Sequence, residues 1–188
     1  MKILAFSGSS RRGSINQSVL DIAIKAARAA GATVTSISLA KFALPLYDGD
    51  LEASEGLPAA VLELKAIFKE HKGLLIACPE YNSSITPLLK NTIDWMSRPA
   101  PKEAPMACFD GKYAGLVAAS GGALGGLRGL FHVRDILQNI RVTVLPDPYM
   151  VAVGKVPELL GADGALKDAR LQGLVEGVGT RLAAVLKD

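Results

Sequence analysis

Residues 2–31 read KILAFSGSSRRGSINQSVLDIAIKAARAAG, and this stretch decides the fold. The apolar run 2–6 predicts a buried strand. Apolar residues from Ile15 to Ala30 then recur at helical spacing, and Gly31 follows as a natural helix end. A turn rich in glycine and serine, residues 7–14, joins the two. A strand, a turn of small residues and a helix form the first unit of an α/β fold.

The turn itself has the composition of a phosphate site. Small residues allow backbone N–H groups to crowd around an anion, and the following helix directs the positive end of its dipole at the same place. Ser9, Ser14 and Asn16 add short hydrogen-bonding side chains, and Arg11 or Arg12 adds positive charge. We therefore predict that this turn binds an anionic group.

Two common nucleotide motifs do not fit this turn. A Walker A loop, GxxxxGK[ST], needs a lysine that is missing after Gly13, and a dinucleotide GxGxxG loop needs a glycine where Ser10 stands. The remaining prediction is a monophosphate held by hydroxyl and backbone groups. Ser14 and Gln17 also fit a helix capping box, which needs no ligand, but capping does not account for Arg11.

Strand and helix patterns alternate along the rest of the chain. The expected strands are residues 2–6, 33–39, 73–78, 113–119 and 142–145. The expected helices begin at Ile15, at Pro58 after a loop through Pro45 and Asp50, at Pro87, after the glycines at 121–126, and at Leu171. This alternation predicts an α/β three-layer sandwich around a five-stranded parallel sheet of order 2-1-3-4-5. Ligands of such sheets bind outside the carboxyl ends of the first and third strands.

Composition narrows the class of protein. With 188 residues, the chain is expected to form a single domain over 1–188. Its net charge of +3 is small and scattered, so we expect no nucleic acid partner. No stretch has the length of a membrane span or the core of a signal peptide, and Cys78 and Cys108 are expected to be reduced core residues, as in a cytoplasmic protein. His71 and His132 lack partners at ligand spacing, so no metal site is expected.

Three loops carry the unusual sequence of the chain, and they follow Phe6, Cys78 and Ala119. The second loop reads PEYNSSITPLLKN over residues 79–91, and the third reads SGGALGG over 120–126. Together with GSSRRGSIN at 8–16, they resemble the patterns PEYNxSxPxxLKNxxDW, SxGxxGG and GSxRxxSxN of the NADPH-dependent FMN reductase family in the flavodoxin-like superfamily. The resemblance extends to about Arg134, and similar members include soluble quinone reductases that also reduce chromate or azo dyes.

This resemblance implies a flavodoxin-like flavoprotein with FMN as cofactor and NADPH, or NADH, as co-substrate. A small-molecule acceptor such as a quinone, chromate, an azo compound or free flavin would then take two electrons. Because the flavin carries the chemistry, no catalytic side chain is expected. The resemblance implies that the cofactor-binding residues are Ser9, Arg11, Ser14, Ile15 and Asn16 around the phosphate, Pro79, Glu80, Tyr81 and Asn82 along the isoalloxazine ring, and Ser120 and Gly122 at its other edge.

Several neighbouring residues have two readings. Lys90 and Asp94 are spaced as a surface ion pair on a helix, and Trp95 is either a core residue or a subunit contact. The glycines at 121–126 could form a flexible hinge rather than a close approach to a ligand. Arg128, His132 and Arg134 fall on one helix, where they could meet the 2′-phosphate of NADPH or face another subunit.

Other functions share this architecture. A flavodoxin-type electron carrier binds FMN but donates single electrons to a protein, and such carriers are commonly acidic, unlike this chain. An FMN-based redox regulator without turnover is a further alternative. A phosphate-ester hydrolase of this architecture is disfavoured, since neither cysteine stands in a CxxxxxR loop. The apolar helices from Pro87 and after Gly126 predict a homodimer or homotetramer.

Overall fold

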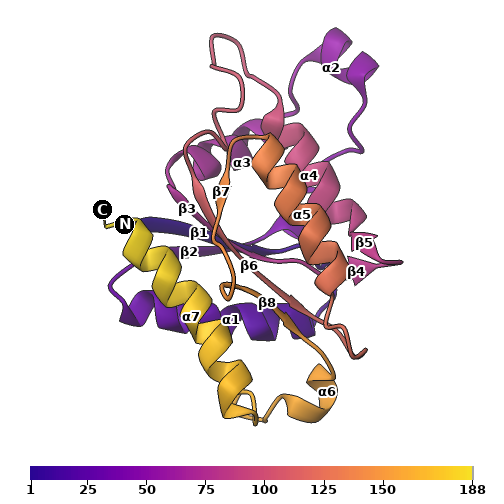
Figure 1. The fold of residues 1–188 in the computed structure, drawn as a ribbon. Helices are drawn as coiled ribbons and strands as arrows, with labels where there is room; N and C mark the ends of the chain where they lie inside the picture. Colours follow the sequence, from indigo (N-terminus) through magenta and orange to yellow (C-terminus); the bar gives the residue numbers. More distant parts are fainter. Residues whose placement is uncertain (188) are drawn as a thin grey trace.

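The computed structural model describes residues 1–187 and has a parallel sheet at its centre (Figure 1). The sheet has the order β2-β1-β3-β6-β7, and β8 also pairs with β6. Every pairing in it is parallel. Its strands are β1 (Lys2–Ser7), β2 (Thr33–Ser38), β3 (Gly73–Ala77), β6 (Tyr113–Ala119), β7 (Thr143–Val144) and β8 (Met150–Val153). The predicted flavodoxin-like order of strands is thereby confirmed.

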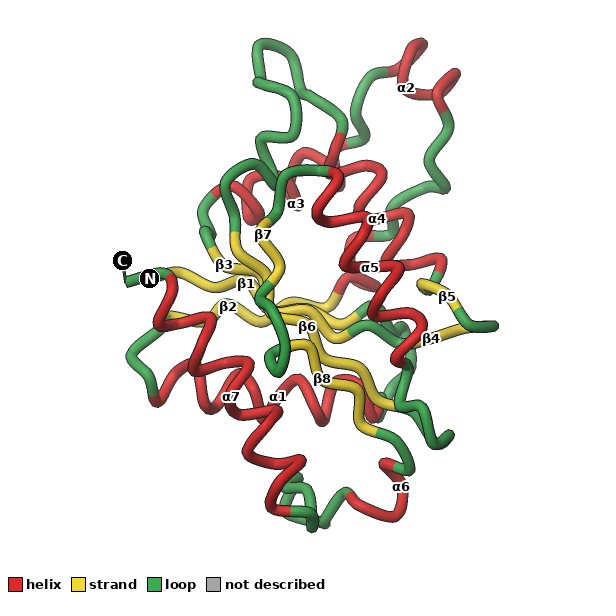
Figure 2. The backbone as a smooth tube through the Cα atoms, viewed as in Figure 1, coloured by secondary structure: helices red, strands yellow, loops and turns green. Residues whose placement is uncertain are grey.

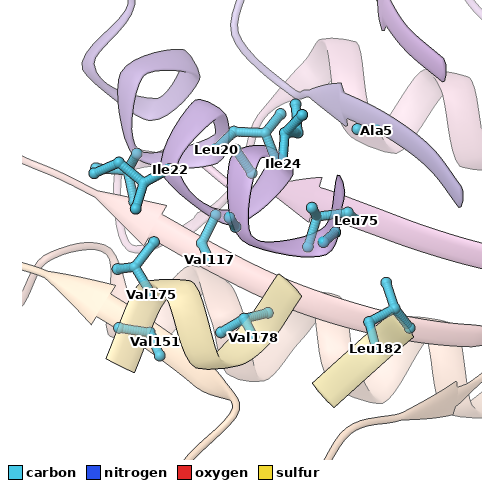
Figure 3. Packing of buried hydrophobic residues seen from close by; sticks show 14 of the residues in the cluster. Ala5, Leu20, Ile22, Ile24, Leu75, Val117, Val151, Val175, Val178 and Leu182 are labelled. Atoms are coloured by element: carbon cyan, nitrogen blue, oxygen red, sulfur yellow. The ribbon is translucent and has the colours of Figure 1, made fainter. Parts of the chain in front are cut away.

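Helices cover both faces of the sheet, which gives the three layers of the sandwich (Figure 2). One face carries α1 (Ile15–Ala29) and α7 (Ala169–Val185), and the other carries α3 (Ala59–Lys69), α4 (Pro87–Ser97) and α5 (Leu127–Asn139). Alternate strand residues serve the two cores: Ile3 and Ala5 pack toward α1, whereas Leu4 and Phe6 pack on the opposite side. Figure 3 shows the first core, where α1 and α7 meet over Leu75 and Val117.

The last position of the sheet differs from the prediction because two short strands share it. β7 pairs with Tyr113 and Ala114, and β8 pairs with residues 116–119 of the same neighbour, β6. The strand predicted at 142–145 corresponds to β7 alone, and β8 was not predicted. The second strand, MVAV, follows a proline turn and is four residues long, which leaves too few residues for a period to show.

Further short elements lie in segments that were expected to be loops. The loop through Pro45 and Asp50 contains a 3-10 helix, η1 (Leu39–Phe42), and a helix, α2 (Gly49–Glu55), whose first turn is capped by the Asp48 side chain. A two-stranded antiparallel hairpin, β4 (Glu80–Tyr81) and β5 (Ser84–Ile85), follows β3. A single turn, α6 (Val156–Leu159), follows β8. None of the helices within residues 1–187 is long and apolar enough to cross a membrane.

Candidate functional site

The carboxyl ends of β1, β3 and β6 lie side by side, and the three unusual loops leave the sheet there. A cavity of about 170 Å³ opens between these loops. It is lined by Ser9, Arg11, Ser14, Ile15, Asn16, Pro79, Glu80, Tyr81, Ala119, Ser120 and Gly121. All the site residues predicted from the sequence are therefore at this cavity except Asn82 and Gly122. We call it the switch-point cavity, because the order of the strands changes direction between β1 and β3.

The first loop leaves polar groups without partners around this cavity. Ser14 is the N-cap of α1 and is 8% exposed, yet its hydroxyl makes no capping hydrogen bond. The alternative capping box does not form, since the Gln17 amide donates to Asp21 Oδ1 at 2.8 Å instead. The first backbone N–H groups of α1, including those of Ile15 and Asn16, have no partner within the helix. These are the donors that a phosphate dianion accepts from, so the loop fits the FMN phosphate.

The side chain of Asn16 has a different role from the one that the resemblance implies. Its Nδ2 donates to the Ala119 carbonyl at 2.8 Å, and its Oδ1 accepts from the Ala119 N–H at 2.9 Å. Both ends of the amide are used, and the residue is 5% exposed. The side chain therefore joins the first loop to the end of β6, and the backbone N–H is what Asn16 offers to a ligand.

The second loop forms the β4–β5 hairpin, which is held against α5. The Glu80 carboxylate accepts from Arg128 Nη2 at 2.7 Å and from the Gly129 N–H at 2.9 Å. Burial acts to raise the pKa of Glu80, but the bonds from Gly129 and Arg128 outweigh it and hold the pKa below its ordinary value. Glu80 therefore stays ionised and anchors the hairpin to α5. Asn82 lies in the turn at φ 48° and does not line the cavity.

Thr86 connects the second loop to the first. The family pattern has proline at this position, and here the proline follows as Pro87. The Thr86 hydroxyl donates to the Gly8 carbonyl at 2.7 Å and caps α4 by accepting from the Leu89 N–H at 3.3 Å. The backbones approach so closely that a Cβ on Gly8 would lie 2.8 Å from the Cβ of Leu89. Glycine at 8 and threonine at 86 thus fix the spacing of the two loops.

The third loop is packed against the end of β8, which the sequence did not reveal. The Ser120 N–H donates to the Val153 carbonyl, and the Lys155 N–H donates to the Gly122 carbonyl, both at 3.1 Å. Gly125 has φ 65°, and a Cβ there would lie 2.6 Å from the backbone of Val153. Gly125 and Gly126 therefore serve close packing, whereas a Cβ on Gly121 would meet nothing within 4 Å. Gly122 exchanges hydrogen bonds with the Ser120 hydroxyl at 3.2 Å and does not line the cavity.

The basic residues of α5 have partners within the chain. Arg128 pairs with Glu80, His132 Nδ1 lies 2.9 Å from the Ser84 hydroxyl, and Arg134 pairs with Asp135 at 3.0 Å. Arg134 also stacks over the Phe131 ring at 4.9 Å. Two of the three residues thus hold the hairpin of the site, which the helical spacing alone could not indicate.

Two other uncertain residues have structural roles. Trp95 is fully buried, and its indole N–H donates to the Pro45 carbonyl at 2.8 Å, so it is a core residue. Lys90 and Asp94 form the expected surface pair at 2.7 Å. Cys78 and Cys108 are buried and free, and burial raises the pKa of both thiols. Within residues 1–187, no three His, Cys, Asp or Glu side chains gather as a metal site would require.

A parallel sheet of the order β2-β1-β3-β6-β7 with helices on both faces is the flavodoxin-like fold. The model of the NADPH-dependent FMN reductase family matches residues 1–156, and the chain belongs to this family. The match continues past Arg134, where the resemblance of the motifs ended.

Individual relatives agree with this assignment. An NAD(P)H-dependent FMN reductase of Pseudomonas aeruginosa is 36% identical over 177 residues, which cover 94% of this chain and 90% of the relative. A quinone reductase of Escherichia coli is 36% identical over 148 residues, 79% of this chain and 75% of the relative. Among solved structures, a flavoenzyme NAD(P)H:acceptor oxidoreductase of Paracoccus denitrificans shares the fold with a TM-score of 0.79 and 24% identity, over 99% of this chain and 97% of that one.

Proposed function

We propose that this chain uses bound FMN and NAD(P)H to reduce quinone-like small molecules by two electrons. The observation that carries the proposal is the switch-point cavity, where the three family motifs meet around Ser14, whose hydroxyl does not cap α1. The names of the two relatives, an FMN reductase and a quinone reductase, support the same chemistry.

The residues of the chain would bind and orient the cofactor. Ser9, Arg11 and Ser14, with the N–H groups that open α1, are suited to its phosphate. The backbone of Pro79, Glu80 and Tyr81 on one side and Ser120 on the other would flank the flat ring. Bound FMN supplies the redox chemistry, namely hydride acceptance from a reduced nicotinamide and delivery of two electrons to an acceptor.

The side chains of the cavity wall suit a protein that binds the cofactor and leaves the redox chemistry to FMN. Glu80 is ionised and turned toward α5, and Asn16 is committed to Ala119, so neither side chain is placed to move a proton. Tyr81 is 46% exposed and offers an aromatic surface at the rim, where a planar acceptor could stack. The chain would therefore act by positioning and by backbone hydrogen bonds rather than by acid–base catalysis.

The first experiment is the visible spectrum of the purified protein. We expect a flavin spectrum, release of FMN on denaturation as judged by chromatography, bleaching by NADPH and recovery on addition of benzoquinone. Recovery of FAD, or the absence of any flavin affinity, would contradict the proposal. FMN that is bound but not reduced by NADPH would favour the electron carrier or the regulator.

The kinetics test whether one site serves both substrates. The three loops surround one cavity at the carboxyl ends of the strands. We therefore expect nicotinamide and acceptor to bind there in turn. Parallel double-reciprocal lines for NADPH and benzoquinone are the expected result. Intersecting lines would show that both substrates are bound together.

The proposal also covers the oligomeric state, the cellular location and the extent of the domain. Leu124, in the third loop, is 52% exposed, and Phe131, on α5, is 39% exposed. We propose that they take part in a homodimer or homotetramer, in which Trp95 has no contact role because it is buried within its own chain. A cytoplasmic location and a single domain over residues 1–188 remain predictions. Light scattering at micromolar concentration measures the assembly.

A further inference from the structure

The phosphate-binding turn has a second cavity on its other side. This cavity, of about 600 Å³, lies between the turn, the start of α1 and the carboxyl end of β2. It shares Ser9, Arg11 and Ser14 with the switch-point cavity, so the two hollows adjoin across one loop. We call it the β2-end cavity.

The residues of the turn differ in which of the two cavities they line. Residues that match the family pattern, Ser9, Arg11, Ser14 and Asn16, all line the switch-point cavity. Ser10 and Arg12 match no fixed letter of that pattern, and they line only the β2-end cavity. The flavin motif therefore does not account for this second group of polar residues.

The charges of the β2-end cavity favour an anion. Its charged residues are Arg11, Arg12, Lys41 and Asp21, which leaves an excess of two positive charges. Within the described part of the chain, none of the three cations lies in an ion pair, whereas Asp21 is held by Gln17. Ser14, whose hydroxyl does not cap α1, is part of the same wall.

The rest of the lining is polar and suits a ribose. Ser36 and Ser38 lie at the exposed end of the edge strand β2, on the α1 side of the sheet, whereas the Ile37 side chain between them packs on the opposite side. The serine hydroxyls can hydrogen-bond to a ribose. Cations without partners at the rim then select for an added phosphate.

We propose that the β2-end cavity binds the adenosine 2′-phosphate end of NADPH, with Arg12 and Lys41 as the residues that distinguish NADPH from NADH. This inference rests on the proposed function, since it concerns the co-substrate of that reaction. It also assigns the 2′-phosphate to the first loop and not to α5, where Arg128 and Arg134 already pair with Glu80 and Asp135.

Binding of 2′,5′-ADP tests the site without turnover. Calorimetry on the protein as purified should show tighter binding of 2′,5′-ADP than of 5′-AMP, with the difference reduced by added salt. Arg12→Ala and Lys41→Ala should each weaken 2′,5′-ADP on the order of tenfold, as expected for the loss of a charged hydrogen bond. Arg12→Lys should retain part of the affinity.

Two further variants serve as comparisons. Arg170→Ala removes an exposed arginine of α7 that does not line the cavity, and it should leave binding of 2′,5′-ADP unchanged. Arg134→Ala tests the competing location on α5. Equal affinity of the parent for 2′,5′-ADP and 5′-AMP, or a loss that follows Arg134→Ala instead of Arg12→Ala, would overturn the inference.

Steady-state kinetics separate this inference from the proposed function. In Arg12→Ala the KM for NADPH should rise about tenfold relative to the KM for NADH. If the parent turns over both nucleotides but the ratio of the two KM values stays the same in the variant, the inference fails and the proposed function stands. If the parent binds 2′,5′-ADP but neither nucleotide reduces a flavin, the proposed function fails.

Discussion

Buried polar residues at the two ends of the parallel strands differ in their hydrogen-bond partners. Near the amino ends, Lys65 is 2% exposed and is held by Glu103 at 2.8 Å and by the Arg98 carbonyl at 2.7 Å. Lys112 there donates to the His71 carbonyl. At the carboxyl ends, Ser14 is 8% exposed, and its hydroxyl does not cap its own helix. A completed network stabilises the fold, whereas an incomplete one indicates where a ligand belongs.

The largest expected effect on stability is at the amino ends of the strands, where the buried polar groups have hydrogen-bond partners. Glu103→Gln removes the carboxylate that pairs with both Lys65 and Lys69, and it leaves the buried Lys65 ammonium without a counter-charge. We expect a loss of about 3 kcal/mol in the free energy of unfolding, measured by urea denaturation. FMN affinity of the folded protein should be unchanged, because the network lies at the opposite end of the strands.

An exposed pair provides the control for this variant. Asp94→Asn breaks the Lys90 ion pair on the surface of α4, which should cost less than about 0.5 kcal/mol. If both substitutions have the same small effect, the network of Lys65 and Glu103 contributes no more than a surface pair, and the comparison of the two ends loses its energetic basis.

The same network should set the response to acid. Burial acts to raise the pKa of Glu103, but the Ala100 N–H and the ammonium groups of Lys65 and Lys69 lower it to about 2. Because the folded pKa lies below the unfolded one, the contribution to stability is complete above the unfolded value of about 4.3 and is lost as the pH falls toward 2. Unfolding free energies between pH 6 and pH 2.5 should decline less steeply in Glu103→Gln. A parallel decline in both proteins would contradict this assignment.

Two adjacent arginines of the first loop can be compared at the carboxyl ends of the strands. Arg11 lines both cavities and Arg12 lines only the β2-end cavity. Arg11→Ala should weaken FMN binding by roughly 1.5–3 kcal/mol, and Arg12→Ala should weaken it far less. Flavin titration of the two apo-proteins measures the difference. Equal, small losses would indicate that both guanidinium groups are merely solvated.

The fold could be predicted from the sequence further than the site could. Long periodic segments, such as 15–29 and 113–119, coincide with α1 and β6 because their apolar residues repeat often enough to define a face. The elements that were missed are short or held by tertiary contacts. β8 has four residues, and α2 buries none of its residues and depends on the Asp48 cap.

The motifs predicted residues that mostly line one cavity, but they did not predict the role of each side chain. Asn16 and Glu80 belong to the predicted set, yet their side chains bind Ala119 and Arg128, which are 103 and 48 positions away in the chain. A local motif contains no information on such distant partners. The close approaches of Gly8 and Gly125 likewise depend on the packing of α4 and β8 against the loops.

Ser14→Ala distinguishes a ligand-binding serine from a capping serine. An N-cap serine that bonds to its helix contributes about 1 kcal/mol to stability. Since the Ser14 hydroxyl makes no such bond, the apo-protein should lose little stability, while FMN affinity should fall by about 1 kcal/mol. Thermal unfolding with and without FMN measures both quantities. A loss of stability in the apo-protein without a loss of FMN affinity would make Ser14 a cap only.

The smallest effect is expected for Tyr81→Phe. The Tyr81 side chain is 46% exposed and makes no hydrogen bond within residues 1–187, so the substitution keeps the aromatic surface and removes a hydroxyl that binds nothing. A general acid or base contributes roughly 10²–10⁴-fold to a rate, so kcat within about threefold of the parent would assign Tyr81 to packing alone. Tyr81→Ala, which removes the ring as well, should raise the KM for benzoquinone more than Tyr81→Phe does. A loss of about a hundredfold in kcat for Tyr81→Phe would instead show that the hydroxyl transfers a proton, and the division of labour between a positioning protein and a reactive flavin would be wrong at this residue.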